Sequence, residues 1–249
     1  MASQESCNPS QGTLYGIGVG PGDPELISVK AVRILQGVDV IFTASSSKND
    51  YSLAVKIVRP YLPQDADIRL LPFPMSMDQD IVHRSWNEHA ETVLDVLERG
   101  HDAAFLTLGD PLTYSTFGYL LRIVEQRAPQ LRIETVPGIT SYQAAAAATN
   151  TPLVEGEENL LLLSGVHGGQ RYRELADMSD NVVFLKAYKN ASDIARALSE
   201  TGRLDCSFGV MRCGFPEQEI LRDLRQLKYR RPTYWTLIIT KSPRDESEP

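Results

Sequence analysis

Three short segments of small and rigid residues could together build a ligand-binding pocket. The first, Gly16–Asp23, is rich in glycine, the second runs from Leu108 to Thr116, and the third is Pro137–Ser141. Each follows an apolar run that is typical of a strand. In an open parallel sheet, ligands bind beyond the carboxyl ends of the strands. The three loops therefore favour a shared pocket over three unrelated turns.

The glycine loop does not have the spacing of a nucleotide-binding loop. A GxGxxG motif that starts at Gly16 would need glycine in place of Pro21, and one that starts at Gly18 would need glycine in place of Asp23. No GK[ST] follows, which excludes a Walker loop. Because Pro21 has no N–H and a fixed φ, we expect a stiff wall for a flat or apolar ligand.

Acid–base, hydrolytic and metal chemistry have little support in the residue types. The chain has three cysteines and four histidines, which are scattered, and it has no CxxC or GxSxG motif. Cys206 and Cys213 are expected to fill core positions. An odd and sparse set of cysteines is typical of a reducing compartment. We therefore predict a cytoplasmic protein without a metal site of its own.

Composition limits the classes of partner. The 249 residues include 25 Lys+Arg and 32 Asp+Glu, a net charge of −7, and 42% of them are hydrophobic. The acidic balance disfavours nucleic acid as a partner. No apolar run reaches the ~18 residues of a membrane span, and the N-terminus lacks the features of a secretory signal. Residues 1–11 and 243–249 are expected to be disordered tails.

Hydrophobic periodicity predicts alternating strands and helices, and hence an α/β fold. The second half contains more strand, with a hairpin expected near Gly214. The Pro137-Gly138 turn divides the chain into an N-terminal α/β domain, 12–136, and a C-terminal α/β domain, 137–242. Strands are expected at Leu14–Val19, Val38–Phe42, Ile68–Leu71, Ala103–Leu108, Leu131–Val136, Leu160–Leu163, Val182–Leu185, Ser207–Met211 and Tyr234–Thr240. Helices are expected at Ser28–Leu35, Ser52–Val58, Gln79–Arg99, Ser115–Arg127, Ala144–Ala148, Arg171–Ala176 and Ser192–Leu198.

The three loops, taken together, resemble those of the tetrapyrrole methylase family, the S-adenosylmethionine-dependent enzymes of sirohaem and cobalamin biosynthesis. The matching pieces are GIGVGPGDPELISVKA (Gly16–Ala31), LGDP (Leu108–Pro111) and VPGITS (Val136–Ser141). Val182–Tyr188 and Val210–Gly214 match more loosely. The order and spacing of these pieces agree over nearly the whole of Leu14–Lys241.

Within that family, one segment resembles the branch that methylates C-20 of precorrin-2 or cobalt-factor II. This segment is Pro72–Asp78, followed by Trp86-Asn87-Glu88. The resemblance implies a two-domain α/β fold with the donor and substrate cleft between the domains, a homodimer, and S-adenosylmethionine as the methyl donor. It also implies methyl transfer to a carbon of the tetrapyrrole, as one step in corrin ring synthesis.

The resemblance also implies which residues bind the donor. Carried over position by position, the donor contacts are Pro21, Leu108, Gly109, Asp110, Thr113, Thr140, Ser141, Lys186 and Gly214. Lys186 stands where relatives often carry an apolar residue. Gly109 is expected to allow a close approach between the backbone and the donor.

Asp110 is the candidate catalytic residue, either to orient the donor or to take up a proton. Asparagine at this position is expected to keep the shape and hydrogen bonding of Asp110 and to remove only its charge. Because the expected substrate is a polycarboxylate, basic residues should bind it, and arginine suits bidentate contacts. The candidates for these contacts are Arg69, Arg84, Lys186, Lys189 and Arg212.

Three alternatives remain open at this point. The acceptor could be another tetrapyrrole position, or RNA or protein, on the same fold. The chain could instead be a non-catalytic nucleotide-binding or scaffolding protein that uses Gly16–Asp23 only as a turn, although the second and third loops argue against this. The sequence does not distinguish a metal-free from a cobalt-bearing tetrapyrrole.

Overall fold

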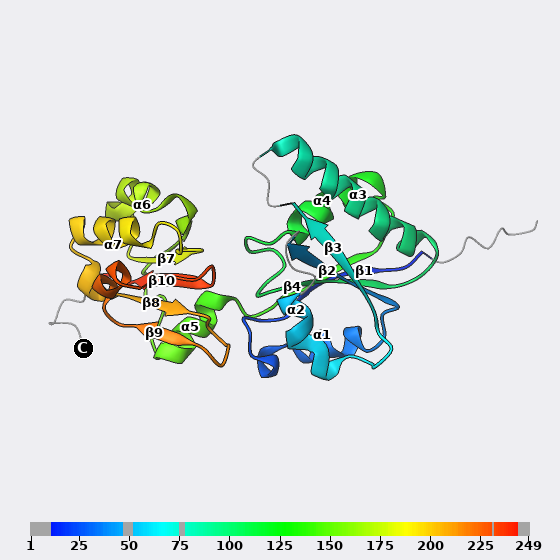
Figure 1. Cartoon of the computed structure of the whole chain (residues 1–249), viewed down its shortest axis with the longest axis horizontal. Coiled ribbons are helices and arrows are strands. Elements are labelled where there is room, and N and C mark those ends of the chain that lie inside the picture. Colours follow the sequence, from blue (N-terminus) through cyan, green and yellow to red (C-terminus); the bar gives the residue numbers. More distant parts are fainter. Residues whose placement is uncertain (1–10, 47–51, 75–77, 231, 244–249) are drawn as a thin grey trace, which may run out of the picture. The chain divides into compact units, whose positions relative to one another are not determined.

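The computed structural model describes residues 11–46, 52–74, 78–230 and 232–243 (Figure 1). The chain divides into two compact units, of which the first ends at Thr140 and the second begins at Ser141. The boundary predicted from the sequence lies four residues earlier, at the Pro137-Gly138 turn. Cys7 lies outside the described residues, as does most of the two predicted tails.

The first unit is built on a parallel sheet of five strands in the order β3-β2-β4-β1-β5. The central strand β4 is buried at every position, as expected for a strand covered on both faces. The strands are β1 (Leu14–Gly18), β2 (Val40–Ser46), β3 (Asp67–Phe73), β4 (Ala103–Thr107) and β5 (Ile133–Val136). All five were predicted, and their order places β1 between β4 and β5.

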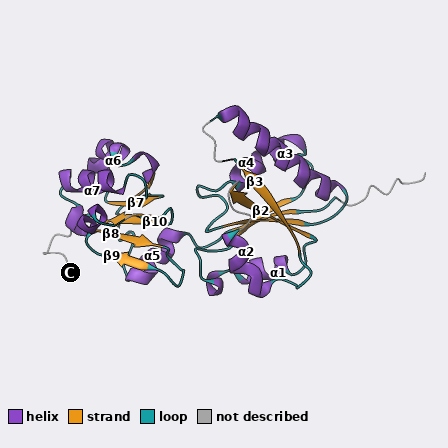
Figure 2. Ribbon diagram, in the orientation of Figure 1, coloured by secondary structure: helices purple, strands orange, loops and turns teal. Residues whose placement is uncertain are grey.

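Helices cover both faces of this sheet, α3 and α4 on one face and α1 and α2 on the other (Figure 2). Side-chain caps fix where two of them begin. Ser28 Oγ accepts from the Ala31 N–H at 3.2 Å before α1, and Asp78 Oδ1 accepts from the Asp80 N–H at 2.9 Å before α3. The helices are α1 (Val29–Leu35), α2 (Leu53–Val58), α3 (Gln79–Glu98) and α4 (Phe117–Arg127), with 3₁₀ turns at Pro24–Leu26 and Arg59–Tyr61.

Strand β3 is longer than the sequence predicted. It was expected to end before Pro72, but it pairs with β2 as far as Phe73. The prediction failed because proline is excluded from central strands and tolerated at edges, and β3 is an edge strand with β2 as its partner. The Pro72 carbonyl in turn accepts a hydrogen bond from His89 Nε2 of α3 at 2.9 Å.

The second unit has a mixed sheet in the order β6-β7-β10-β8-β9. Strand β6 is parallel to β7, whereas β10 is antiparallel to both of its neighbours, β7 and β8. Strands β8 and β9 form the hairpin expected near Gly214. The strands are β6 (Leu160–Ser164), β7 (Asn181–Leu185), β8 (Ser207–Met211), β9 (Glu219–Leu221) and β10 (Thr236–Thr240). One edge of the sheet therefore holds the carboxyl ends of β6, β7 and β8 and the amino end of β10.

Helices also cover both faces of the second sheet (Figure 2). Helix α5 packs its fully buried Ala145 near Val183 and Leu237, as its run of alanines predicts. The helices are α5 (Ser141–Thr149), α6 (Gln170–Leu175) and α7 (Ala191–Glu200), and 3₁₀ turns lie at Gly165–His167, Ala176–Met178, Leu204–Cys206 and Leu224–Lys228. Within the described part of the chain, no helix has the length and apolar character needed to cross a membrane.

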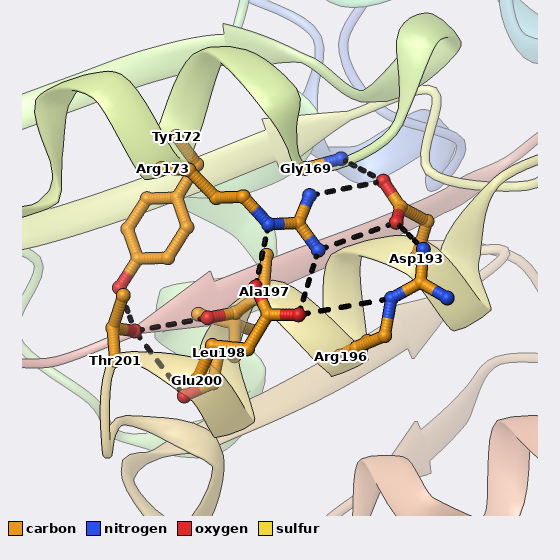
Figure 3. A network of polar contacts seen from close by, with 9 residues as sticks. All are labelled: Gly169, Tyr172, Arg173, Asp193, Arg196, Ala197, Leu198, Glu200 and Thr201. Atoms are coloured by element: carbon orange, nitrogen blue, oxygen red, sulfur yellow. Dashed lines mark hydrogen bonds and ion pairs between the residues drawn. The ribbon is translucent and has the colours of Figure 1, made fainter.

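A network of charged side chains joins α6 to α7 (Figure 3). Asp193 Oδ2 accepts from the Gly169 N–H at 2.8 Å, and Asp193 also forms ion pairs with Arg173 and Arg196. Arg173 Nε contacts Glu200 Oε2 at 2.5 Å. The Gly169 N–H, followed by the Arg173 guanidinium, lowers the pKa of Asp193 to about 2. The ionised form of Asp193 therefore stabilises the fold.

We expect Asp193→Asn to destabilise the protein at neutral pH by about 1–2 kcal/mol, because it weakens the contacts with Gly169 and Arg173. The pKa of Asp193 is lower in the fold than in the unfolded chain. Its contribution is therefore complete above an ordinary aspartate pKa, ~4, and is lost as the pH falls towards 2. The difference in urea midpoint between wild type and variant should be constant from pH 7 to 5 and shrink below pH 4.

The control is Glu174→Gln, which removes an exposed pair with Arg171 and should change the midpoint little. If the difference in urea midpoint between wild type and Asp193→Asn were as large at pH 2 as at pH 7, the assignment of the low pKa to Asp193 would be contradicted.

Candidate active site

The three loops singled out from the sequence follow β1, β4 and β5, which are adjacent strands of the first sheet. The loops after β1 and β4 are joined by a two-residue bridge. The Gly109 N–H donates to Gly20 O at 2.7 Å, and the Gly20 N–H donates to Gly109 O at 3.3 Å. Because parallel strands end at the same edge, the strand order alone brings the loops together.

Two glycines hold these loops in direct backbone contact. A Cβ atom added to Gly138 would lie 2.1 Å from Gly109 O and 2.8 Å from Gly18 Cα. One added to Gly18 would lie 2.6 Å from Gly109 O and from Gly138 N. Real Cβ contacts are never this short, so no side chain fits at either position. Both glycines lie within the motifs of the sequence, but the sequence does not indicate that they pack on each other.

The backbone conformation of Gly109 favours glycine. Within the protein, a Cβ at Gly109 would meet Ile139 O and Thr140 Cα at an ordinary 3.9 Å. Its φ is +71°, in the left-handed region that favours glycine. The closest backbone contacts between the loops are therefore at Gly18 and Gly138, and the close approach of the donor to Gly109 stays a prediction.

Asp110 connects two of the loops through both of its carboxylate oxygens. Oδ1 accepts from the Leu112 N–H at 2.9 Å and from the Thr113 hydroxyl at 3.2 Å. Oδ2 accepts from the Gly138 N–H at 3.2 Å. The expectation that asparagine would keep this hydrogen bonding is wrong, because an amide NH₂ cannot accept a bond from the Gly138 N–H. Asp110 thus positions the loop after β4 against the loop after β5.

Six of the predicted donor-binding residues lie on the parts of these three loops that belong to the first unit. Pro21, Gly109 and Thr140 are buried, and Leu108, Asp110 and Thr113 are half-buried. The remaining three belong to the second unit. Ser141 is the first residue of α5, Lys186 directly follows β7, and Gly214 lies in the turn after β8.

The four predicted substrate cations Arg69, Arg84, Lys189 and Arg212 lie on four different segments of the chain. Arg69 on β3 is held by Asp67, with Nη2 to Oδ2 at 2.6 Å, and this bond raises its pKa. Lys189 lies over the ring of Tyr188, 5.7 Å from its centroid. Arg212 forms an ion pair with Glu217 at 3.7 Å. Arg84 on α3 lines a cavity of about 280 Å³ together with Pro72, Pro74, Ile81, Ser85 and Glu88.

Cysteines and metal-ligating residues do not add to the site. Cys213 is buried, as expected, and burial raises its pKa to about 11, whereas Cys206 is half-buried. No group of three or more His, Cys, Asp or Glu side chains that could hold a metal ion occurs among the described residues.

The family model for tetrapyrrole (corrin/porphyrin) methylases matches residues 13–228. The chain belongs to this family. Cobalt-precorrin-2 C(20)-methyltransferase of Salmonella typhimurium is 32% identical over 92% of this chain and 97% of that relative. Precorrin-2 C(20)-methyltransferase of a Sinorhizobium species is 31% identical over 94% of this chain and 97% of that relative.

The fold is also that of a solved member of the family. Uroporphyrin-III C-methyltransferase of Thermus thermophilus, in complex with S-adenosylhomocysteine, superposes with a TM-score of 0.65 at 24% identity. The match covers 92% of this chain and 97% of that one. The expected two-domain tetrapyrrole methylase-like fold is thereby confirmed.

Proposed function

We propose that this protein transfers a methyl group from S-adenosylmethionine to C-20 of precorrin-2 or cobalt-factor II, a step in the synthesis of the corrin ring of cobalamin. The observation that carries the proposal is the identity of 31–32% with two C(20)-methyltransferases over more than nine-tenths of the chain. The assembled glycine loops support it, because all three motifs of the resemblance meet at one edge of the first sheet.

The donor would be held by the loops of the first unit, with further contacts from Ser141, Lys186 and Gly214. S-adenosylmethionine supplies a methyl group that is already electrophilic, so the protein needs mainly to align it and exclude water. The stiff backbone around Gly18 and Gly138 suits this task, because it offers a fixed surface without side chains. Asp110 would act as a positioning residue that holds the loops in register.

The methyl group would pass in line to the electron-rich C-20 carbon of the tetrapyrrole, which then loses its proton. Cationic side chains would bind the carboxylates of the acceptor, and the candidates remain Arg69, Arg84, Lys189 and Arg212. The two relatives are named for a cobalt-bearing and a metal-free acceptor at nearly equal identity. Both forms therefore belong in the test.

The deciding experiment is an anaerobic incubation with S-adenosylmethionine and either metal-free or cobalt-bearing acceptor. Mass spectrometry should show the gain of one methyl group, and nuclear magnetic resonance should place it at C-20. Methylation at another carbon would move the protein to a different branch of the family. Binding of S-adenosylhomocysteine by calorimetry without methylation of either acceptor would favour an RNA or protein acceptor, and no binding would favour a non-catalytic protein.

We further propose that the protein is a cytoplasmic homodimer that acts without nucleic acid or membrane partners. The sparse cysteines and the net charge of −7 support the compartment and the absence of nucleic acid. Sedimentation velocity at micromolar concentration measures the assembly, and a monomer there would contradict the dimer.

A further inference from the structure

One edge of the second sheet brings two cationic residues to either side of Trp235. Strand β10 lies between β7 and β8, and Trp235 directly precedes it. The Arg212 N–H donates to Trp235 O at 3.1 Å, and the Ala187 N–H, next to Lys186, donates to Thr236 O at 2.9 Å. Lys186 and Arg212 are each the first residue after a strand. Because β10 is antiparallel to β7 and β8, Lys186 and Arg212 lie on the two sides of Trp235.

Both cations have a strained backbone. Among the described residues, four that are not glycine have a positive φ, and Lys186 (+57°) and Arg212 (+50°) are two of them. Neither is Asn or Asp, whose side chains tolerate this conformation. A left-handed non-glycine residue costs about 1–3 kcal/mol, and such residues cluster at functional sites. Two strained cations beside one tryptophan are therefore a sign of a function at this edge.

The same edge exposes a cluster of aromatic rings. The rings of Tyr234 and Trp235 meet edge to face at 5.0 Å, Tyr188 packs on Tyr234 at 5.2 Å, and Phe215 lies 6.5 Å from Trp235. Tyr234 and Trp235 are nevertheless 43% and 38% exposed. Large aromatic side chains left exposed as a group are typical of binding surfaces.

The charge of this edge matches an acidic ligand. Lys189 lies over the Tyr188 ring, and Arg212 contacts its partner Glu217 only at 3.7 Å. Burial lowers the pKa of Lys186, because it removes water from around the ammonium group. In addition, the Thr233 hydroxyl is buried and has no hydrogen-bond partner among the described residues.

We propose that Trp235 and Tyr234 form a platform for one face of the tetrapyrrole, and that Lys186 and Arg212 bind its peripheral carboxylates. A flat, conjugated ring with acidic side chains fits exposed aromatics flanked by cations. This inference rests on the proposed function, assigns a part of its acceptor site, and moves the Lys186 side chain from the donor contacts to the acceptor contacts.

The test uses Arg212→Gly, which removes the cation and also relieves the left-handed strain. We expect the Tm to rise by about 2–4 °C. Affinity for cobalt-factor II, from an absorbance titration without donor, should fall about tenfold or more. Affinity for S-adenosylhomocysteine, from calorimetry, should stay within about twofold, well under one tenfold step. Arg212→Lys should recover part of the acceptor affinity without the gain in Tm.

Two controls separate the platform from general effects. Asn150→Gly acts on another left-handed residue of the same unit, φ +49°, and should leave acceptor affinity unchanged. Trp235→Ala should weaken acceptor binding, whereas Tyr229→Ala, at a tyrosine of the same unit that is 84% exposed, should not.

If Arg212→Gly and Trp235→Ala both kept wild-type affinity for the acceptor, the platform would be overturned and the proposed function would stand. A loss of S-adenosylhomocysteine affinity instead would assign this edge to the donor and also overturn it. A wild-type protein that binds S-adenosylhomocysteine but neither form of the acceptor would overturn the proposed function together with the platform.

Discussion

Replacing Gly138 with alanine is expected to abolish donor binding, with a loss of about 100-fold or more in affinity for S-adenosylhomocysteine. The new Cβ would lie 2.1 Å from Gly109 O and 2.8 Å from Gly18 Cα. These are main-chain atoms, so at least one loop must move. Overpacking of this kind costs about 3 kcal/mol, and the Tm should fall by about 6–12 °C. Calorimetry and thermal unfolding measure the two effects.

The matched control is Gly118→Ala. Gly118 lies in α4, and a Cβ there has nothing within 4 Å, so the change should stabilise the protein slightly because alanine is the better helix former. Gly109→Ala is the comparison within the site. The added atom fits in space, and only the positive φ opposes it. Gly138→Ala with wild-type Tm and donor affinity would show that the loops do not meet as described.

The Asp110→Asn substitution is expected to lower the Tm and donor affinity together. Oδ2 of Asp110 accepts from the Gly138 N–H, and an NH₂ group there would face that donor instead. Losing this charge-assisted bond costs about 1.5–3 kcal/mol. We expect the Tm to fall by about 3–12 °C and the donor Kd to rise about tenfold. At saturating donor, the single-turnover rate should fall only a few-fold, because the chemistry itself is unchanged.

Asp23→Asn is the control in the neighbouring loop. Asp23 Oδ1 accepts a hydrogen bond from the Glu25 N–H at 2.9 Å, and asparagine can accept the same bond. Its Tm and donor affinity should stay near wild type. Asp110→Asn could instead keep the wild-type Tm and donor affinity while its single-turnover rate at saturating donor falls about 100-fold or more, ~2.7 kcal/mol in the barrier. That result would show that Asp110 takes part in the chemistry.

Much of the fold of the first unit could be predicted because its signals are local. Buried parallel strands are continuous apolar runs, and the helices between them carry their own caps, such as Ser28 before α1 and Asp78 before α3. The loops at the carboxyl ends of the strands follow from this alternation. The second unit was predicted less fully, because β9 is only three residues long and gave no signal beyond a turn near Gly214.

The α/β class, the resemblance to the tetrapyrrole methylases and the three loops that carry it could therefore be predicted from the residues alone. Which atoms are in contact depends on the packing of the folded chain. The contact of Gly18 with Gly138, and the bond from Gly138 to Asp110, join residues far apart in the chain. Likewise, Lys186, Arg212 and Trp235 come together because β10 enters the sheet between β7 and β8. Periodicity reports which residues share a face of one element, whereas strand order depends on the packing of the whole sheet, so no local pattern could specify these contacts.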